Sequence, residues 1–383
     1  MQKNFLKNIR EKSEVLGKLW LEEGFQSVFG GFAENINVSG GFKDTVFRAM
    51  VQARQIYSVS VFQDLGIATE VMRTNALKAA NLLISKYQTP SGAVWNSINE
   101  KHEVVDATHG FYAQAFALFG WAYAYRLSAD PRYEIAAAKL LQYLQDERGV
   151  STGGFYELGR EERLFLANPH MHLFEAALAW IEVSQENHWK SLAKSLLRLC
   201  DEKFIPNKDG MLAEYYTESW TPILDTQSRF VVEPGHQCEW AWLIGRYDRL
   251  VGQGSSTLKV ELFEKAEVYG LNQEGFIVDE VWSDGEVKSH RSRLWPQCER
   301  VKAAAMLAED CSADKYSKLA GAGVERVLSY ISDGGGLPLW REYYHGEGRY
   351  QYFEDQWVKA SSLYHVMGAL SEYDRVFGRK ENE

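Results

Sequence analysis

The sequence predicts an all-α protein, an (α/α)6 barrel of twelve helices with short β-hairpin loops at one mouth. Three observations support this fold: six apolar helical runs at even spacing, six helices with a charged face between them, and a Gly-led segment after each charged helix. Helical hairpins with small and aromatic inner faces can stack side by side and close into a ring. An open solenoid is the alternative, but six repeats account for the whole 383-residue chain and favour closure.

The apolar runs are expected to be the inner helices of the ring. Five of them start at residues 109, 172, 236, 300 and 365, so successive starts lie 63, 64, 64 and 65 residues apart. A further step of 63 back from residue 109 reaches Val46, at the start of the first run. The predicted inner helices are 45–61, 109–126, 172–183, 236–250, 300–307 and 365–376.

The segments between these runs have polar stripes and a 3.6-residue period, which is typical of an outer layer of helices. The predicted outer helices are 5–23, 75–87, 132–146, 188–203, 258–269 and 315–331. After each comes a Gly-led, mostly aromatic segment that reads as a short hairpin or ordered loop. These segments are 30–32, 92–95, 153–156, 210–212, 275–278 and 335–337. No linker divides the repeats, so residues 1–383 are expected to form a single domain.

Composition and charge limit the function classes. A hydrophobic fraction of 45% with 13% aromatic residues is ample for a large core, and no run of 18 apolar residues predicts a membrane span. The formal charge of -10 argues against a nucleic-acid partner. The four cysteines lack CxxC spacing, and the N-terminus lacks the apolar core of a signal peptide, so a cytoplasmic protein is expected. A small neutral ligand is the expected partner of a monomer or homodimer.

Polar side chains gather where the inner helices are expected to begin. Pro234 and Gly235 precede a helical run, which places His236 in its first turn and Glu239 one turn later. His172 and Glu175 have the same H-x-x-E spacing, which puts each pair on one helical face. Packing alone would favour apolar residues at these places. The other repeats add Arg54, His109, Tyr112, Gln114, Asn168, Trp295, Gln297, Glu299 and His365.

Several chemistries remain open for this set. His170 and His172 invite a metal, but no H-E-x-x-H pair supports one, and neither a metal nor another cofactor is expected. Inverting glycoside hydrolysis would need two opposed carboxylates. The candidates for that role are Glu175, Glu239, Glu299 and Asp355. A non-catalytic sugar- or protein-binding barrel is a further alternative.

The pairing of each histidine with a carboxylate favours imidazole as the proton carrier and the carboxylate as its orienting partner. An imidazole that titrates near neutrality suits removal of a proton next to a sugar carbonyl. The positive ends of the helices and Arg54 would stabilise the enediolate oxygens that develop. Aldose–ketose isomerisation and 2-epimerisation both follow from this chemistry.

Four motifs in order carry a resemblance to a known family. They are 168–176 (NPHMHLFEA), 234–242 (PGHQCEWAW), 293–300 (RLWPQCER) and 360–365 (ASSLYH). Together they resemble the N-acylglucosamine 2-epimerase superfamily over nearly the whole chain. The EWAW and RLWPQ residues are similar to its D-mannose isomerase branch.

The resemblance implies a metal-free enzyme that interconverts D-mannose and D-fructose, with D-lyxose and D-xylulose as a further pair. His236 and His365 would move the proton between C2 and C1 through a cis-enediol, and His172 would assist ring opening. Glu239 would orient its neighbouring histidine. The substrate-binding residues would be Arg54, Tyr112, Asn168, Glu175, Trp295 and Gln297. One departure is the run 112–116, YAQAF, where the mannose isomerases have Tyr-Asp-His-Ala-Phe, so the substrate range is open.

Overall fold

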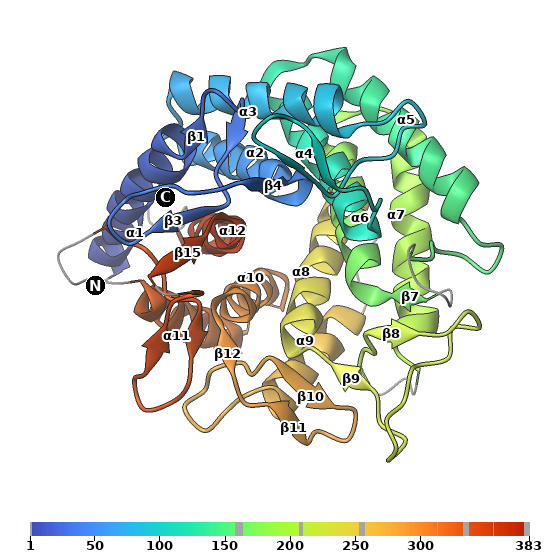
Figure 1. The fold of residues 1–383 in the computed structure, drawn as a ribbon. Coiled ribbons are helices and arrows are strands. Elements are labelled where there is room, and N and C mark those ends of the chain that lie inside the picture. The colour runs from blue at the N-terminus through green and yellow to red at the C-terminus, as the bar shows by residue number, and fades with distance from the viewer. Residues whose placement is uncertain are drawn as a thin grey trace.

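The protein forms a ring of helical hairpins in the computed structural model, which describes residues 2–157, 164–206, 210–252, 257–311, 313–331, 337–354 and 356–378 (Figure 1). The predicted (α/α)6 barrel is confirmed. The inner helices are α2 (Ala49–Asp64), α4 (Phe111–Ser128), α6 (Ala167–Val183), α8 (Pro234–Val251), α10 (Leu294–Cys311) and α12 (Leu363–Phe377). Asp355 and the Gly335–Gly336 pair of the predicted loops lie outside the described residues.

Six further helices cover the ring from outside. They are α1 (Gln2–Gly17), α3 (Glu70–Leu82), α5 (Pro131–Arg148), α7 (Asn187–Leu199), α9 (Leu258–Tyr269) and α11 (Asp314–Tyr330). Thr69 begins α3 by accepting a 3.1 Å hydrogen bond from the Met72 amide, and Asp130 caps α5. Helices α1, α3 and α7 end in π-helical turns, Lys18–Glu23, Leu83–Tyr87 and Cys200–Phe204, so the predicted outer helices covered both parts.

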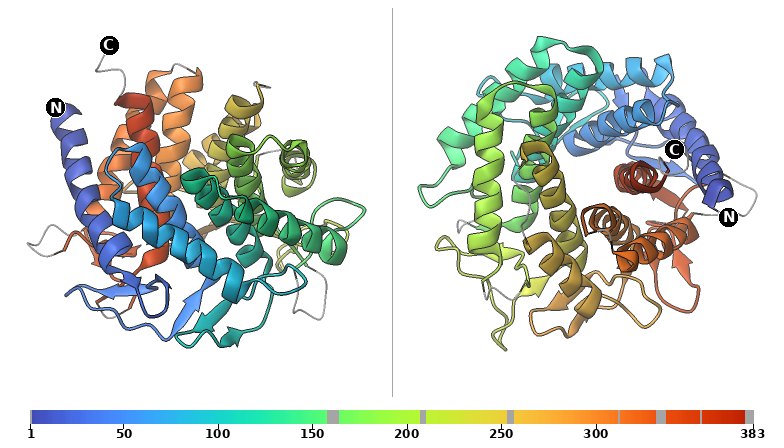
Figure 2. Two further views of the ribbon diagram at one scale, coloured as in Figure 1. Left: turned by 90° about the horizontal axis from the view of Figure 1, so that it is seen from above. Right: turned by 180° about the vertical axis from the view of Figure 1, so that it is seen from behind.

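The inner helices pack side by side around the ring, and α12 packs against α2 to close it. Small residues permit the close approach of neighbouring helices. A Cβ atom at Gly120 in α4 would lie only 2.8 Å from the Cβ of Ala53 in α2, so glycine is needed at this crossing. Helix α4 is buried on almost every side, as expected for a helix that is apolar all round. Figure 2 shows the ring from two further directions.

Short antiparallel strands gather at the end of the ring where the inner helices begin (Figure 2, left). They are β1 (Phe25–Gln26), β2 (Gly31–Phe32), β3 (Asn35–Asn37), β4 (Val46–Arg48), β5 (Ser97–Asn99), β6 (Val104–Asp106), β7 (Phe165–Leu166), β8 (Tyr215–Tyr216), β9 (Val231–Val232), β10 (Glu280–Trp282), β11 (Val287–Ser289), β12 (Ser292–Arg293), β13 (Tyr343–Tyr344), β14 (Tyr350–Gln351) and β15 (Trp357–Lys359). The predicted hairpin loops at one mouth are confirmed.

In the described part of the chain, strand pairing links five of the six repeats to the one that follows. Strands β4, β7, β9 and β12 lead into inner helices and pair with β5, β8, β10 and β13 of the following loops. Strand β15, before the last inner helix, pairs with β3 of the first loop. The helices therefore close the ring, and the strands form six small separate sheets among the described residues. Among the described residues, no helix has the length and hydropathy required to cross a bilayer.

Candidate active site

A cavity of about 360 Å³ lies at the mouth of the ring where the inner helices begin. Eight of the predicted site residues line it: Arg54, Tyr112, Asn168, His172, His236, Glu239, Trp295 and His365. They come from all six repeats. Glu175 and Gln297, which were also predicted to bind substrate, do not line this cavity. The structure brings most of the predicted set together, whereas the roles of these residues stay predictions.

Helix periodicity explains which side chains reach the cavity. Each inner helix is numbered here from its first residue, and the sixth one begins with the 3₁₀ turn Ala360–Ser362 that leads into α12. The sixth residues are Arg54, Phe116, His172, Glu239, Glu299 and His365. The fourth residues are Gln52, Gln114, His170, Gln237, Gln297 and Leu363. Side chains two residues apart on an α-helix point in directions that differ by about 160°. The sixth residues therefore face the axis of the ring, and the fourth residues face the loops.

The fourth residues hold the loops rather than a ligand. Gln297 donates from Nε2 to the Ile277 carbonyl at 2.9 Å, and its Oε1 accepts from the Ile277 amide at 2.9 Å. Gln52 makes the same pair of bonds with Phe32, and Gln114 makes it with Val94. The prediction that Gln297 binds substrate is therefore corrected, because its amide is fully used by the backbone.

His170 has the corresponding place in the third repeat. Its Nε2 accepts from the Phe155 amide at 2.9 Å, and its Nδ1 lies 2.7 Å from the Leu166 carbonyl. Burial lowers its pKa to about 4, and the Leu166 carbonyl only partly opposes this shift. His170 is thus a neutral structural residue, and its spacing from His172 does not make a shared metal site. His109 also lies outside the cavity lining, with its Nδ1 3.1 Å from the Val94 carbonyl.

His172 and Glu175 form the pair that their spacing predicts. Nδ1 of His172 lies 3.1 Å from Glu175 Oε2, and Oε1 of the same carboxylate accepts from the Tyr364 hydroxyl. Burial raises the pKa of Glu175, but the bond with His172 outweighs it and holds the pKa below its usual value. Glu175 therefore holds His172 in place and does not line the cavity. The prediction that it contacts the substrate is corrected accordingly.

His236 is held by carboxylates from the loops. Its Nδ1 lies 3.1 Å from Glu214 Oε1 and 3.8 Å from Glu233 Oε1. Burial alone would lower the pKa of His236, but Glu214 and Glu233 raise it to about 10. The prediction that Glu239 orients His236 is wrong, since Glu239 Oε1 instead lies 4.0 Å from Nδ1 of His172. The third and sixth positions of one helix point about 60° apart, which separates these two side chains.

His365 has a different environment. Its Nδ1 lies 2.7 Å from Glu299 Oε1, and Oε2 of this carboxylate lies 2.6 Å from the Lys302 ammonium. All three side chains are buried. Burial, Arg54 and Lys302 together hold the pKa of His365 well below its usual value. Burial and Glu239 raise the pKa of Glu299, and Lys302 opposes that shift. The lowered pKa, due first to burial, favours the uncharged imidazole of His365.

Trp295 and Arg54 complete the space between the histidines. The Trp295 ring lies 5.0 Å from the His236 ring and 5.6 Å from the His365 ring, measured between centroids. Arg54 donates to the Tyr112 hydroxyl at 2.7 Å and to the Ser361 carbonyl at 3.2 Å. Its buried Nε has no acceptor among the described residues.

Glu214 and Lys302 were not singled out from the sequence. A signal for Glu214 exists in the repeat: Glu214, Asp279 and Glu342 each precede the first strand of a loop, at spacings of 65 and 63 residues. Lys302 lies three residues after Glu299 in α10, where a lysine also fits an exposed helix face.

Three groups of side chains have ligand atoms close enough to hold a metal ion. They are His172 with Glu175 and Glu239, His236 with Glu214 and Glu233, and His365 with Glu239 and Glu299. Within each group these atoms lie within 4.8 Å of one another. Nδ1 of each histidine already pairs with a carboxylate, and Lys302 pairs with Glu299. The absence of a metal requirement stays a prediction.

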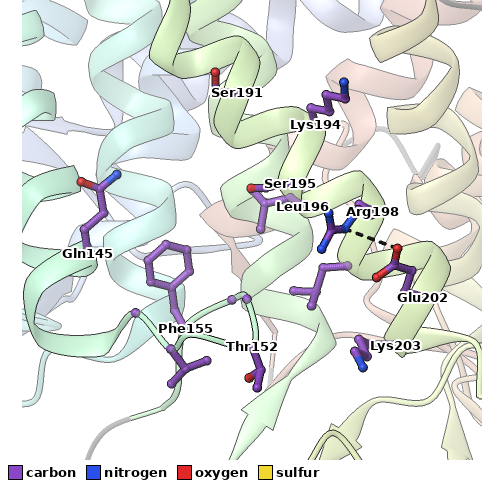
Figure 3. Close-up of a pocket in the computed structure, with 15 residues that line it drawn as sticks. Gln145, Thr152, Phe155, Ser191, Lys194, Ser195, Leu196, Arg198, Glu202 and Lys203 are labelled. Atoms are coloured by element: carbon purple, nitrogen blue, oxygen red, sulfur yellow. Dashed lines mark ion pairs between the residues drawn. The ribbon is translucent and has the colours of Figure 1, made fainter.

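A second cavity, about 600 Å³ in volume, lies outside the ring between α5 and α7 (Figure 3). Its polar lining includes Ser191, Lys194 and Lys203, and Arg198 is paired with Glu202 at 3.3 Å. None of its described lining residues is a histidine, and it shares no lining residue with the cavity at the mouth of the ring. The smaller cavity inside the ring is therefore the candidate active site.

Comparisons with known proteins agree with this geometry. The sequence profile of the N-acylglucosamine 2-epimerase (GlcNAc 2-epimerase) family matches residues 30–369. The chain is 32% identical over 368 residues to "Mannose-6-phosphate isomerase" of Rhizobium meliloti, covering 93% of each protein. It is also similar to the crystal structure of a D-mannose isomerase, with a TM-score of 0.85 and 20% identity over 97% of this chain and 98% of that one.

A cellobiose 2-epimerase from Bacillus thermoamylovorans has the same fold, with a TM-score of 0.85 and 17% identity over 98% of this chain and all of that chain. At this identity the likeness concerns the fold alone. The profile match over most of the chain and the 32% identical relative go further, because they link the sequence itself to one family. This chain belongs to the N-acylglucosamine 2-epimerase family of sugar isomerases and epimerases.

Proposed function

We propose that this protein is an aldose–ketose isomerase that interconverts D-mannose and D-fructose by proton transfer between C2 and C1 through a cis-enediol. One observation carries the proposal: His236 and His365 line one cavity, and each has its Nδ1 held by a carboxylate. This leaves Nε2 of both rings available, since neither makes a hydrogen bond within the described part of the chain. Two imidazoles on one substrate can act as base and acid.

The surroundings of the two histidines favour opposite charges. His365 is uncharged because burial, Arg54 and Lys302 lower its pKa, so it acts as the base. It removes the proton from C2 of the open-chain aldose and returns it to C1. His236 carries a proton because Glu214 and Glu233 raise its pKa to about 10, so it acts as the acid. It donates this proton to O1 as the enediol forms, and the O2 proton restores it when the ketose is made.

The other cavity residues fit roles around this transfer. Arg54 lines the cavity and places a positive charge beside the developing negative charge on the enediolate, and such an interaction lowers this kind of barrier. His172, held by Glu175, is placed to move a proton during opening of the sugar ring. Trp295 lies between His236 and His365 and gives the sugar an apolar wall.

Sugar 2-epimerisation on the same scaffold is the second candidate. It is favoured by the family profile and by the shared fold of a cellobiose 2-epimerase. Epimerisation begins with the same removal of the C2 proton, but the proton returns to the opposite face of C2. Two histidines on one cavity allow this outcome as well, so the products decide between the candidates.

The test is incubation of the purified protein with D-mannose in heavy water, followed by NMR. Isomerisation predicts fructose with deuterium at C1, whereas epimerisation predicts early glucose with deuterium at C2. His365→Asn and His236→Asn should each lower kcat by about 10²- to 10⁴-fold without loss of the folded state. Gln237→Asn, which changes a loop-holding amide in the same helix, is the matched control. Failure to convert mannose or lyxose to any ketose would refute the isomerase.

A further inference from the structure

The residue immediately before each inner helix forms the outer rim of the active-site mouth. These six residues are Arg48, Gly110, Leu166, Glu233, Arg293 and Lys359. The three cations belong to the fifth, sixth and first repeats, which are neighbours because the ring closes. All three line the candidate active site. One arc of the rim is therefore cationic, and the opposite arc is not.

Helix formation alone gives no reason for these cations, although Arg48 and Arg293 each pair with a buried carboxylate. The N-terminus of a helix carries a partial positive charge, so Arg or Lys is disfavoured there and Asp, Asn, Ser or Thr is preferred. The side chains of Arg48 and Lys359 make no capping hydrogen bond to their helices. Three unfavourable placements in adjacent repeats indicate a function other than helix formation, since a helix N-terminus and a basic side chain both attract an anion.

The three cations differ in whether a carboxylate already neutralises their charge. Arg48 pairs with Glu34 at 2.7 Å, and Arg293 pairs with Asp279 at 2.8 Å. These carboxylates are almost fully buried behind the rim. Lys359 has no carboxylate within 4.0 Å among the described residues, and its ammonium lies 3.6 Å over the ring of Phe353.

The remaining charges near Lys359 do not replace such a partner. Glu342 also lines the cavity, but it accepts a 3.0 Å hydrogen bond from Ser362, and burial raises its pKa. Burial lowers the pKa of Lys359, Glu342 opposes this, and Arg48 and Arg293 add to the lowering. The Lys359 ammonium thus lies among like charges at the edge of a sugar-sized cavity, and an anion there would relieve the repulsion.

We propose that Lys359, Arg48 and Arg293 form a subsite for an anionic substituent on the sugar, with a phosphate monoester as the group that fits it best. Planar guanidinium groups and an ammonium are the side chains that bind phosphate oxygens in proteins. The relative from Rhizobium meliloti carries the name of an enzyme for a phosphorylated mannose. The inference rests on the proposed function, because it assumes that a sugar occupies the cavity.

The test compares kcat/KM for D-mannose 6-phosphate with kcat/KM for D-mannose in three proteins. Lys359→Gln should lower the ratio of the two values by about 10-fold or more, since a charged hydrogen bond to phosphate is lost. Lys359→Arg should restore most of the ratio. Lys318→Gln, on the exposed face of α11, removes the same charge elsewhere and should leave the ratio unchanged. Inorganic phosphate should compete with mannose in the wild type and less in Lys359→Gln.

An equal effect of Lys359→Gln on both sugars, together with no competition by inorganic phosphate, would overturn the subsite. Calorimetric binding of mannose 6-phosphate separates this result from failure of the proposed reaction. If neither sugar is converted but Lys359→Gln weakens binding about 10-fold, the subsite stands and the isomerase does not. If mannose is isomerised while mannose 6-phosphate binds both proteins equally, the isomerase stands and the subsite does not.

Discussion

Replacement of Lys302 by methionine should raise the pKa of His365 and move the acidic limb of the kcat/KM profile to higher pH. Lys302 Nζ lies 2.6 Å from one oxygen of Glu299, and the other oxygen lies 2.7 Å from Nδ1 of His365. Burial, Arg54 and Lys302 hold the pKa of this histidine well below its usual value. Methionine keeps the length of the side chain and removes its charge.

The size of the repulsion follows from Coulomb's law. The path through one carboxylate places the ammonium and the imidazole roughly 6 Å apart, and at an effective dielectric constant of about 20 their repulsion is about 2.8 kcal/mol. The methionine variant lacks this repulsion, so the pKa of His365 rises. His365 acts as a base in its neutral form, which is lost as the pH falls through its pKa. A raised pKa therefore removes activity between the old and the new value and leaves the alkaline side unchanged.

The assay is the pH dependence of kcat/KM, because this quantity reports the pKa values of the free enzyme. Loss of one partner of a buried ion pair destabilises a protein by about 3–5 kcal/mol, so the profile is measured below the melting temperature of the variant. Lys259→Met is the matched control, since Lys259 is a buried lysine paired with Asp248 at 2.9 Å and lies outside the cavity lining. It should lower stability without moving the acidic limb. A Lys302→Met enzyme with the wild-type limb and only a lower plateau would refute the electrostatic role.

Two further substitutions test the environment of His236 and the structural role of Gln297. Glu214→Gln should lower the pKa of His236 from its raised value of about 10. Because His236 acts as imidazolium in the proposed mechanism, the alkaline limb of the kcat/KM profile should then move to lower pH. An alkaline limb that does not move would contradict the role of this carboxylate. Gln297→Ala should lower the free energy of unfolding by about 1–3 kcal/mol, because it leaves the amide and carbonyl of Ile277 unpaired in the interior, whereas KM should stay within about twofold of the wild type. Urea unfolding and steady-state kinetics measure these two quantities, and a large rise in KM would return Gln297 to the binding site.

The fold was predictable because its signal repeats. Each inner helix is apolar and small on nearly all sides, and the period of the runs is set by one helical hairpin with its loop. The predicted helix starts were less accurate than the spacing: the inner helix predicted to start at 172 begins at Ala167, five residues earlier. Polar residues such as Asn168 and His170 precede the apolar run and hide the first turn of the helix. The His170 side chain is held by the backbone, whereas Asn168 lines the cavity and its buried Oδ1 has no partner among the described residues.

The residues of the candidate site were mostly predictable from the sequence, but the carboxylate partner of each histidine was not. The H-x-x-E spacing predicted two equivalent pairs, and it is correct for His172 with Glu175 only. In the other repeat the histidine is three positions nearer to the start of its helix, so its carboxylate comes from a loop, as Glu214. Spacing along one helix cannot show a partner that lies 22 residues earlier, in a loop.

The same limit explains why the charges of the two central histidines could not be assigned from their own motifs. Both histidines have a carboxylate next to Nδ1, and both line the cavity. The two histidines differ in the charged group next to that carboxylate. In the case of His365, a buried lysine contacts the other oxygen of the carboxylate, whereas His236 has a second carboxylate at 3.8 Å. An isomerase needs a base and an acid at one pH, and two identical side chains can provide both only if their surroundings differ. In the proposed mechanism, Lys302 therefore helps to keep His365 a base although it does not line the cavity, and its removal should make the two histidines more alike.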